Sequence, residues 1–300
     1  MAAQIIDGKK IAQNLREQVK SCIASIAEGD KPGLAVILVG KDPASSVYVG
    51  AKVKACNELG IESFEYKLEA NVTEEGIIRL IRDLNSDAQI NGILVQLPLP
   101  KHLNEERILA EIDHAKDVDG FHVVNAGLLS IGSKKAIIPC TPMGCNIMLK
   151  SVISNMAGMN AVVVGRSNIV GKPMANLLLQ DNCTVTIVHS KTRNIKEICA
   201  NADILVAAVG VAEMITADYV KEGAYVIDVG INRVEDATKP RGYRLTGDVN
   251  FGDVLPKVAA ITPVPGGVGP MTIACLMLNT LICYYRQNNR ELPLNIQALI

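Results

Sequence analysis

Short apolar runs alternate with longer segments of helical periodicity along the first half of the chain. The segment after Asp42-Pro43 is predicted to be a helix that ends near Gly60, because Asp is a good N-cap and Pro suits the first turn. A second helix is predicted after Thr73, with its apolar residues three and four apart on one face. The β-α-β-α-β order predicts a parallel sheet with right-handed crossovers. The runs predicted to be strands are residues 33–40, 61–68 and 90–97.

The second half of the chain repeats this alternation, with four apolar runs spaced like consecutive βα units. Residues 231–248 are polar and contain Lys239-Pro240 and Arg241-Gly242, which predicts an excursion or a hairpin. Residues 259–270 then lead into a final apolar helix. The four predicted strands are residues 160–165, 184–190, 202–210 and 224–230.

These elements predict an α/β protein with two αβα domains of mainly parallel sheets, the second of them Rossmann-like. A length of 300 residues agrees with two domains at roughly 150 residues each. We place the boundary near residue 142 and expect the final helix to pack back on the first domain. The predicted domains are therefore residues 1–142 plus 271–300, and residues 143–270, with a cleft between them.

Composition excludes several classes of protein. Apolar residues make up 49% and charged residues 20%, which is typical of a globular core rather than a disordered chain. The formal net charge of −1 disfavours binding to nucleic acid or to a membrane surface, because both usually require a basic excess. Aromatics are only 3%, so aliphatic side chains must build the core.

The eight cysteines form no C-x-x-C motif, and none has a His at zinc-ligand spacing. Scattered cysteines in apolar contexts indicate reduced core residues of a cytoplasmic protein, and the opening MAAQIIDGKK does not resemble a signal peptide. The apolar stretch Met271–Tyr285 is shorter than the ~20 residues that span a bilayer. We expect it to be a buried helix.

The segment VVVGRSNIVGKP (162–173) predicts a strand, a Gly-bounded loop and a helix, an arrangement that suits an anionic ligand at the helix N-terminus. A phosphate-binding P-loop is disfavoured, because Pro173 stands where that motif requires Ser or Thr after the Lys. The G-x-G-x-x-G motif is also incomplete, with Ser167 at its second Gly. An ordinary βα turn explains such a loop equally well.

The next predicted strand favours NADP over NAD. NAD-binding folds usually carry an acid about 20 residues after the Gly-rich loop, where it accepts the ribose hydroxyls. Here the corresponding residues 189–193 read HSKTR and contain no acid. Together with Arg166, this segment is suited to the 2′-phosphate of NADP.

Tyr48 and Lys52 are spaced i,i+4 on a predicted helix. They could simply be a surface pair. Short-chain dehydrogenases use a similar pair with Tyr as the proton donor, but there it follows an N-terminal Rossmann unit, whereas here it precedes the predicted nucleotide domain. A third interpretation requires further polar groups on the same side of the cleft.

Three further features supply such groups. Gln96 ends the third predicted strand, where open α/β sheets bind ligands. Asp119 lies on a Gly-terminated loop, and PVPGGVGP (263–270) is a rigid loop that a connector would not require. Each has an ordinary structural explanation by itself, since strand-end glutamines and turn aspartates are common.

Taken together, eight motifs resemble the bifunctional methylenetetrahydrofolate dehydrogenase/methenyltetrahydrofolate cyclohydrolase family in order and spacing, from about residue 5 to residue 285. The Gly165 loop and the PVPGGVGP loop are its most specific motifs. The motifs are YVGAK (48–52), VQLPLP (95–100), KDVDGF (116–121), PCTPMG (139–144), VVVGRSNIVGKP (162–173), HSKT (189–192), DVGIN (228–232) and TPVPGGVGP (262–270).

The resemblance implies two reactions of one-carbon metabolism, which supports purine, methionine and histidine biosynthesis. A hydride passes from 5,10-methylenetetrahydrofolate to NADP, and the methenyl cation is then hydrolysed to 10-formyltetrahydrofolate. It also implies a cytoplasmic homodimer that binds tetrahydrofolate derivatives, with residues 1–142 plus 271–300 as the folate-binding catalytic domain and 143–270 as the NADP domain.

By resemblance, four residues are catalytic. Lys52 is central to the hydrolysis, Tyr48 packs on the folate rings, Gln96 forms a hydrogen bond near Lys52, and Asp119 anchors the pterin. Further substrate-binding residues implied by the resemblance are Val95, Leu97, Pro265, Gly266, Gly267, Val268 and Gly269. The implied cofactor-binding residues are Gly165, Arg166, Ser167, Ser190, Ile231, Thr141 and Cys140.

A catalytic role for Lys52 makes a chemical demand. A free lysine titrates near ~10.4, so a neutral base near pH 7 requires partial burial or a cationic neighbour, such as the methenyl substrate itself. The chain departs from many relatives at Leu128 and from many bacterial ones at Val123, both at the edge of the expected site. The alternatives are a monofunctional or inactive NADP-binding homologue and a short-chain-type oxidoreductase.

Overall fold

The computed structural model describes residues 3–27, 29–239 and 242–299, which divide into two compact units. Unit 1 combines Met1–Ala12 with Thr141–Thr272, and unit 2 combines Gln13–Cys140 with Ile273–Ile300. Each unit contains a parallel sheet, so the predicted α/β class with mainly parallel sheets is confirmed.

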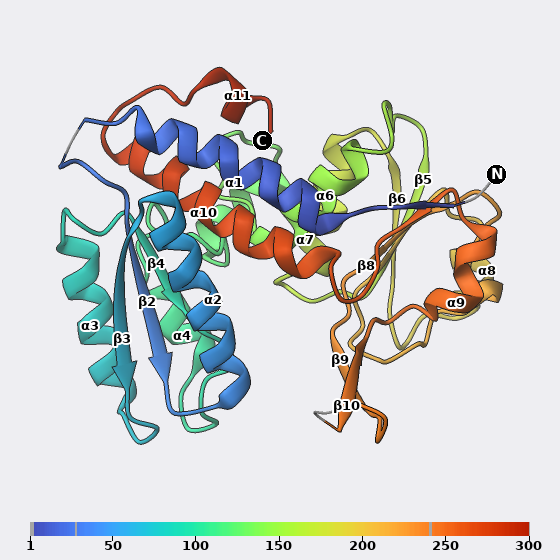
Figure 1. Ribbon diagram of the computed structural model, residues 1–300, viewed down its shortest axis with the longest axis horizontal. Helices are drawn as coiled ribbons and strands as arrows, with labels where there is room; N and C mark the ends of the chain where they lie inside the picture. The colour runs from blue at the N-terminus through green and yellow to red at the C-terminus, as the bar shows by residue number, and fades with distance from the viewer. Residues whose placement is uncertain (1–2, 28, 240–241, 300) are drawn as a thin grey trace. The chain divides into compact units, whose positions relative to one another are not determined.

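Unit 2 is built on a three-stranded parallel sheet in the order β3-β2-β4. The central strand, β2 (Gly33–Val39), is buried at all seven positions, as a parallel strand covered on both faces should be. Helices α2 (Pro43–Leu59) and α3 (Glu74–Ser86) cover opposite faces of this sheet (Figure 1). The flanking strands are β3 (Glu62–Leu68) and β4 (Gly92–Val95).

The caps predicted for these two helices are present. The Asp42 carboxylate accepts a hydrogen bond from Ser45 N at 2.7 Å, and Gly60 ends α2 in the left-handed conformation with φ 82°. Thr73 Oγ1 accepts from Gly76 N at 3.2 Å at the start of α3. The apolar face of α3 then packs on β2 and β4 through Ile77, Ile81 and Leu84.

Unit 1 contains a six-stranded parallel sheet in the order β1-β11-β8-β7-β5-β6. Its buried core is almost entirely aliphatic, as the composition predicts. The strands are β1 (Gln4–Ile5), β5 (Asn160–Val164), β6 (Thr184–Val188), β7 (Ile204–Ala207), β8 (Tyr225–Asp228) and β11 (Ala260–Ile261). The helical segments within this unit are α7 (Gly171–Gln180), α8 (Ile195–Cys199), η1 (Ala217–Tyr219), α9 (Phe251–Val254) and η2 (Leu255–Lys257).

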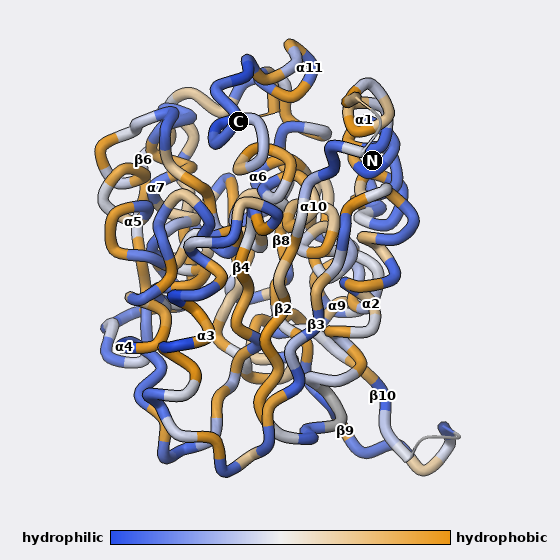
Figure 2. Tube along the Cα trace, turned by 90° about the vertical axis from the view of Figure 1, so that its left-hand side faces the viewer, coloured by the Kyte–Doolittle hydropathy of each residue, from blue (hydrophilic) through white to orange (hydrophobic). Residues whose placement is uncertain are grey.

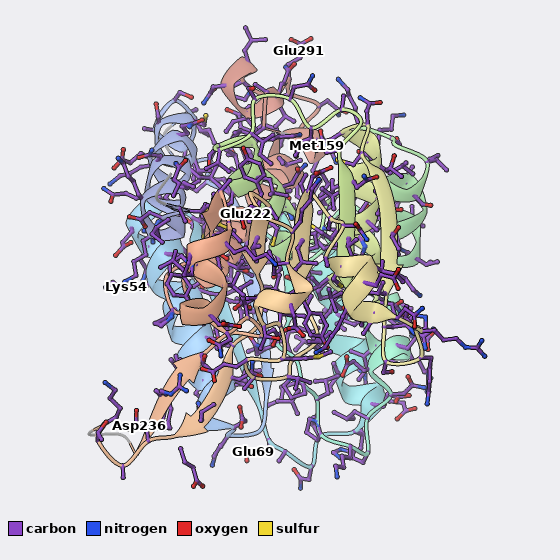
Figure 3. The ribbon with its side chains drawn as sticks, turned by 90° about the vertical axis from the view of Figure 1, so that its right-hand side faces the viewer. Lys54, Glu69, Met159, Glu222, Asp236 and Glu291 are labelled. Carbon is purple, nitrogen blue, oxygen red and sulfur yellow. The ribbon has the colours of Figure 1, made fainter. Side chains whose placement is uncertain are left out.

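The polar excursion predicted for residues 231–248 is an antiparallel hairpin of β9 (Asn232–Glu235) and β10 (Tyr243–Thr246). Asp236 lies near its far end in Figure 3. Two residues of the predicted turn, Pro240 and Arg241, lie outside the described residues.

The short strands β1 and β11 were not predicted. They pair with each other in parallel, with Gln4 opposite Ala260, and β11 also pairs with β8. This pairing explains why Met1–Ala12 group with unit 1, although the predicted first domain, 1–142, includes them.

The remaining helices include the apolar helix α10 (Val268–Gln287). It is long and apolar enough to cross a membrane by length and composition, but 78% of its most apolar window is buried inside the protein, as in a core helix. Figure 2 shows the apolar character of this segment and of β2. The remaining helices are α1 (Gly8–Ala24), α4 (Glu105–Ala110), α5 (Val123–Ser130), α6 (Cys140–Lys150), α10 (Val268–Gln287) and α11 (Leu294–Gln297).

Candidate active site

Helix α2 and strand β4 bring Lys52 and Gln96 together in unit 2. Lys52 Nζ donates a hydrogen bond to Gln96 Oε1 at 2.9 Å, and Gln96 Nε2 donates to the carbonyl of Leu97 at 2.6 Å. The second bond orients the amide so that its oxygen faces the lysine. Gln96 N also donates to Ile37 O at 2.9 Å, which extends the strand pairing by one residue. Leu97 is half-buried and Val95, the last residue of β4, is buried.

Tyr48 lies one helical turn before Lys52 on α2, and 43% of its surface is exposed. An exposed aromatic residue on a helix leaves apolar ring surface open to contact. Lys54, on the same helix, forms an ion pair with Glu58 at 3.8 Å. Figure 3 labels this lysine at the edge of the molecule.

Asp119 follows a segment that runs beside β4, where Asp117 forms a parallel bridge with Ile93. Burial raises the pKa of the Asp119 carboxyl from its usual 3.8 to about 6, and the charge of Asp117 adds to this rise. The positive charge of Lys52 acts in the opposite direction and lowers the same pKa. The two side chains are therefore electrostatically coupled, so unit 2 brings Lys52, Gln96 and Asp119 together.

Cys140 begins α6 and is buried. Its thiol donates to Val118 O at 3.4 Å and lies 3.9 Å from Asp119 Oδ1, so it contacts the residues around Asp119. Burial raises the pKa of this thiol, and the neighbouring carboxylate raises it further. The side chain is therefore neutral and a poor nucleophile.

In unit 1, two glycines shape the loop between β5 and α7. Gly165 has φ +122°, and a Cβ at this position would lie 2.2 Å from Ala208 O. A Cβ on Gly171 would lie 2.3 Å from Gly165 O. The loop is therefore so closely packed that neither position accommodates a side chain. Ser167 Oγ accepts hydrogen bonds from Val170 N and Gly171 N, which organises the start of α7.

Arg166 and Ser190 are both exposed, on the loops that follow β5 and β6. The Ser190 loop is held by two local bonds, from His189 N to Thr192 Oγ1 at 2.9 Å and from Lys191 N to His189 Nδ1 at 3.1 Å. Exposed cationic and hydroxyl groups at the carboxyl ends of adjacent parallel strands suit a phosphate.

The PVPGGVGP loop contacts Ile231 within unit 1. A Cβ on Gly269 would lie 3.7 Å from Ile231 Cδ1, and Ile231 itself is 47% exposed. Pro265 is exposed, whereas Gly266, Gly267 and Val268 are buried, and the helix α10 starts at Val268 within this motif. Thr141 Oγ1 lies 3.0 Å from Thr272 Oγ1, which links the starts of α6 and α10.

The sequence interpretation missed two buried carboxylates, Asp228 and Asp248. Asp248 Oδ2 accepts from Val209 N and Gly210 N, at 2.7 and 2.9 Å. Asp228 accepts from three backbone N–H groups, among them Asp248 N at 2.8 Å, while burial raises its pKa to about 6. The motif DVGIN contains Asp228, but one aspartate after a strand does not predict such a network.

Among the described residues, no group of three or more His, Cys, Asp or Glu could hold a metal ion. The predicted residues of unit 2 are organised around Lys52, Gln96 and Asp119. Those of unit 1 lie on the loops at the carboxyl ends of its parallel strands and on the PVPGGVGP loop.

Two family profiles match the chain. Residues 6–119 match the profile described as "Tetrahydrofolate dehydrogenase/cyclohydrolase, catalytic domain". Residues 139–288 match "Tetrahydrofolate dehydrogenase/cyclohydrolase, NAD(P)-binding domain". The chain belongs to this family. The resemblance seen in the sequence motifs is thereby confirmed.

Curated relatives and solved structures agree with the family. "Bifunctional protein FolD" of Erythrobacter litoralis is 56% identical, over 98% of this chain and 99% of that protein. The bifunctional FolD of Campylobacter jejuni has a TM-score of 0.90 at 44% identity, covering 95% of this chain and 100% of that chain. The Trypanosoma brucei FolD structure, complexed with NADP cofactor and inhibitor, has a TM-score of 0.92 at 39% identity, covering 96% and 99%.

Proposed function

We propose that this enzyme oxidises 5,10-methylenetetrahydrofolate with NADP and hydrolyses the resulting methenyl cation to 10-formyltetrahydrofolate. The hydrogen bond from Lys52 Nζ to Gln96 Oε1, with the coupled carboxylate of Asp119 beside it, carries this proposal. Unit 2 therefore contains a lysine fixed by a hydrogen bond, an amide with a defined orientation and a carboxylate. The family membership supports both activities.

The residues of the Gly165 loop fit a dinucleotide. Neither Gly165 nor Gly171 has room for a Cβ, so the loop packs tightly at the N-terminus of the ten-residue helix α7. The positive end of the helix dipole favours an anionic pyrophosphate there. Arg166 and Ser190 would hold the 2′-phosphate, and Ser167 would add its hydroxyl. Ile231 would contact the nicotinamide side. When bound, NADP supplies the acceptor for the hydride.

The oxidation requires alignment rather than acid or base catalysis, because no proton moves when the methylene carbon loses a hydride. Asp119 would anchor the pterin through hydrogen bonds from the ring N–H groups to its carboxylate. Tyr48 would stack on the folate rings with its exposed face. These contacts would fix the position of the reacting carbon.

The hydrolysis adds one water to the methenyl carbon, breaks the bond from that carbon to N5, and releases one proton overall. Lys52 would accept the first proton of the attacking water, and the second, on the resulting hydroxyl, would pass to N5 as the formyl C=O forms and the ring opens. Gln96 restricts the lysine to one position, because its oxygen accepts a hydrogen bond from Lys52 Nζ.

One coupled assay tests both steps. Purified protein is given methylenetetrahydrofolate and NADP, and the formation of NADPH and the decay of the methenyl compound are followed together. We expect both signals. If NADPH forms but the methenyl compound does not decay enzymatically, the protein is a monofunctional dehydrogenase. If no NADPH forms, the proposal is refuted. Oxidation of simple alcohols without folate would instead support a short-chain-type oxidoreductase.

We further infer a cytoplasmic homodimer. β6 is the edge strand of the unit 1 sheet, and its Ile187 is 39% exposed. Leu179 of the preceding helix α7 is 60% exposed. An uncovered strand edge with apolar side chains is a template for pairing with a second copy. Ile187→Lys should therefore give a monomer by light scattering. If the variant has the same molar mass in solution as the native protein, the edge-strand interface is contradicted.

A further inference from the structure

A buried amide that has no role in the proposed chemistry lies behind the Asp119 loop. Asn279 is fully buried in the middle of α10, between Leu278 and Thr280. Burying a polar group is unfavourable unless its hydrogen bonds are made, so each bond of this residue requires an explanation.

The two N–H groups of Asn279 bind two different backbone segments. Nδ2 donates to Val118 O at 2.8 Å and to Ile138 O at 2.9 Å, and Cys140 Sγ lies 3.6 Å from the same nitrogen. Val118 immediately precedes Asp119, and Ile138 lies two residues before Cys140. One side chain from α10 therefore joins the Asp119 loop to the segment that packs on it.

The single oxygen of the same amide shows that this arrangement has a cost. Asn279 Oδ1 is buried and makes no hydrogen bond within the described part of the chain. An unsatisfied buried acceptor destabilises the folded protein, and an apolar residue in this apolar helix would avoid that cost. The requirement that the side chain meets is therefore the donation to the two carbonyls.

The two backbone segments are also packed without space between them. Gly120 has φ +70°, and a Cβ at this position would lie 2.5 Å from Ile137 O. Asn125 closes the far side, because its Nδ2 donates to Asp117 Oδ2 at 3.0 Å and its Oδ1 accepts from Ile137 N at 3.2 Å. Two buried amides, Asn279 and Asn125, thus tie the residues just before Asp119 to residues 137–138.

The Asp119 carboxylate itself has weaker support. It accepts a long contact of 3.9 Å from the thiol of Cys140 and is coupled electrostatically to Lys52. A carboxylate that must accept bonds from a ligand is best left without strong partners of its own, and its position then depends on its backbone. We propose that Asn279 is the positioning residue that sets Asp119 for the pterin, an inference that rests on the proposed function.

The test compares two buried variants of the same helix in the full-length enzyme. Asn279→Leu keeps the size of the side chain and removes both donors. Thr280→Val, the matched control, removes an equally buried hydroxyl whose hydrogen bond, at 2.9 Å, stays within the helix at Leu276 O. Asn279→Asp provides a second variant of nearly unchanged shape that also loses donors.

We expect Asn279→Leu to raise the KM for methylenetetrahydrofolate by about tenfold, since a misplaced charge-assisted hydrogen bond costs about 1.4 kcal/mol or more. The KM for NADP of the same variant should change by less than about twofold. Thr280→Val should leave both constants unchanged, even if it lowers the melting temperature equally.

Equal changes of both constants in Asn279→Leu, or changes no larger than those of Thr280→Val, would overturn the positioning role. Should Asn279→Leu not fold, Asn279→Asp decides by the same comparison of KM values. An inactive native enzyme would instead refute the proposed function, and the binding of tetrahydrofolate to the variants, measured by calorimetry, would then still test the placement of Asp119.

Discussion

Replacing Asp119 with Asn should stabilise the protein at neutral pH while it weakens folate binding. Burial raises the pKa of this carboxyl from 3.8 to about 6. The ionised form is therefore less favourable in the folded protein than in the unfolded chain. The difference of about two pH units corresponds to at most about 3 kcal/mol of unfolding free energy above pH 6.

The sign of the pH dependence follows directly. Above pH 6 the carboxylate is ionised in both states, and its full destabilising effect is present. As the pH falls from 6 towards 3.8, the folded protein binds the proton first, and this destabilisation disappears. Asp119→Asn should therefore unfold at a higher temperature than the native protein at pH 8, and the difference should shrink by pH 5.

The same carboxylate should control folate affinity in the opposite direction. A neutral Asn accepts weaker hydrogen bonds than a carboxylate, and losing a charge-assisted bond costs about 1.5–3 kcal/mol, or roughly 10- to 100-fold in kcat/KM for the folate. In the native enzyme, this kcat/KM should fall about tenfold for each pH unit below 6.

Thermal unfolding at pH 8 and pH 5 and steady-state kinetics are the two measurements. Asp83→Asn, on an exposed position of α3, is the matched control and should change neither. A lower stability of Asp119→Asn at pH 8, or a stability difference that does not depend on pH, would refute the reasoning that this charge is buried without sufficient compensation.

Three further substitutions test the site. Lys52→Met should abolish the cyclohydrolase activity and retain part of the dehydrogenase activity, and equal hydrolysis rates in variant and native enzyme would contradict the general-base role. Arg166→Ala should raise the KM for NADP far more than that for NAD, and an unchanged preference would contradict its contact with the 2′-phosphate. Gly165→Ala places a Cβ 2.2 Å from Ala208 O and should raise the KM for NADP and lower the melting temperature, whereas Gly127→Ala, in an open helical position, should do neither.

The local signals in the sequence predict much of the fold. The caps at Asp42, Gly60 and Thr73 are present, because they depend on residues a few positions apart. The predicted strands overlap the observed ones but are longer, as with 202–210 against Ile204–Ala207. An apolar run continues into a loop wherever that loop is buried, and the sequence does not mark the last paired residue.

Elements whose stability depends on distant pairing were not predicted. β1 and β11 have two residues each and exist only because they pair across more than two hundred positions. Helix α1 was also left out, although Ala12, Leu15, Val19 and Ile23 are buried at helical spacing and could have been recognised.

The candidate site separates into parts that motifs reveal and parts that they do not. Lys52 is predicted from its i,i+4 spacing to Tyr48, Gln96 from its place at a strand end, and Asp119 from the Gly that follows it. Their grouping could not be derived from spacing alone. It depends on α2 and β4 placing two side chains within 2.9 Å across 44 positions of sequence.

Asn279 shows where sequence reasoning reaches its limit. In the sequence it is a single polar residue in an apolar helix, and its most natural interpretation is an interruption that excludes a membrane span. Its two hydrogen bonds connect it to carbonyls 141 and 161 positions away, and backbone carbonyls leave no trace in a sequence. A residue that acts through another residue's backbone has no motif of its own. Its role can be inferred only once the loop it supports, and the carboxylate of Asp119 on that loop, are seen together.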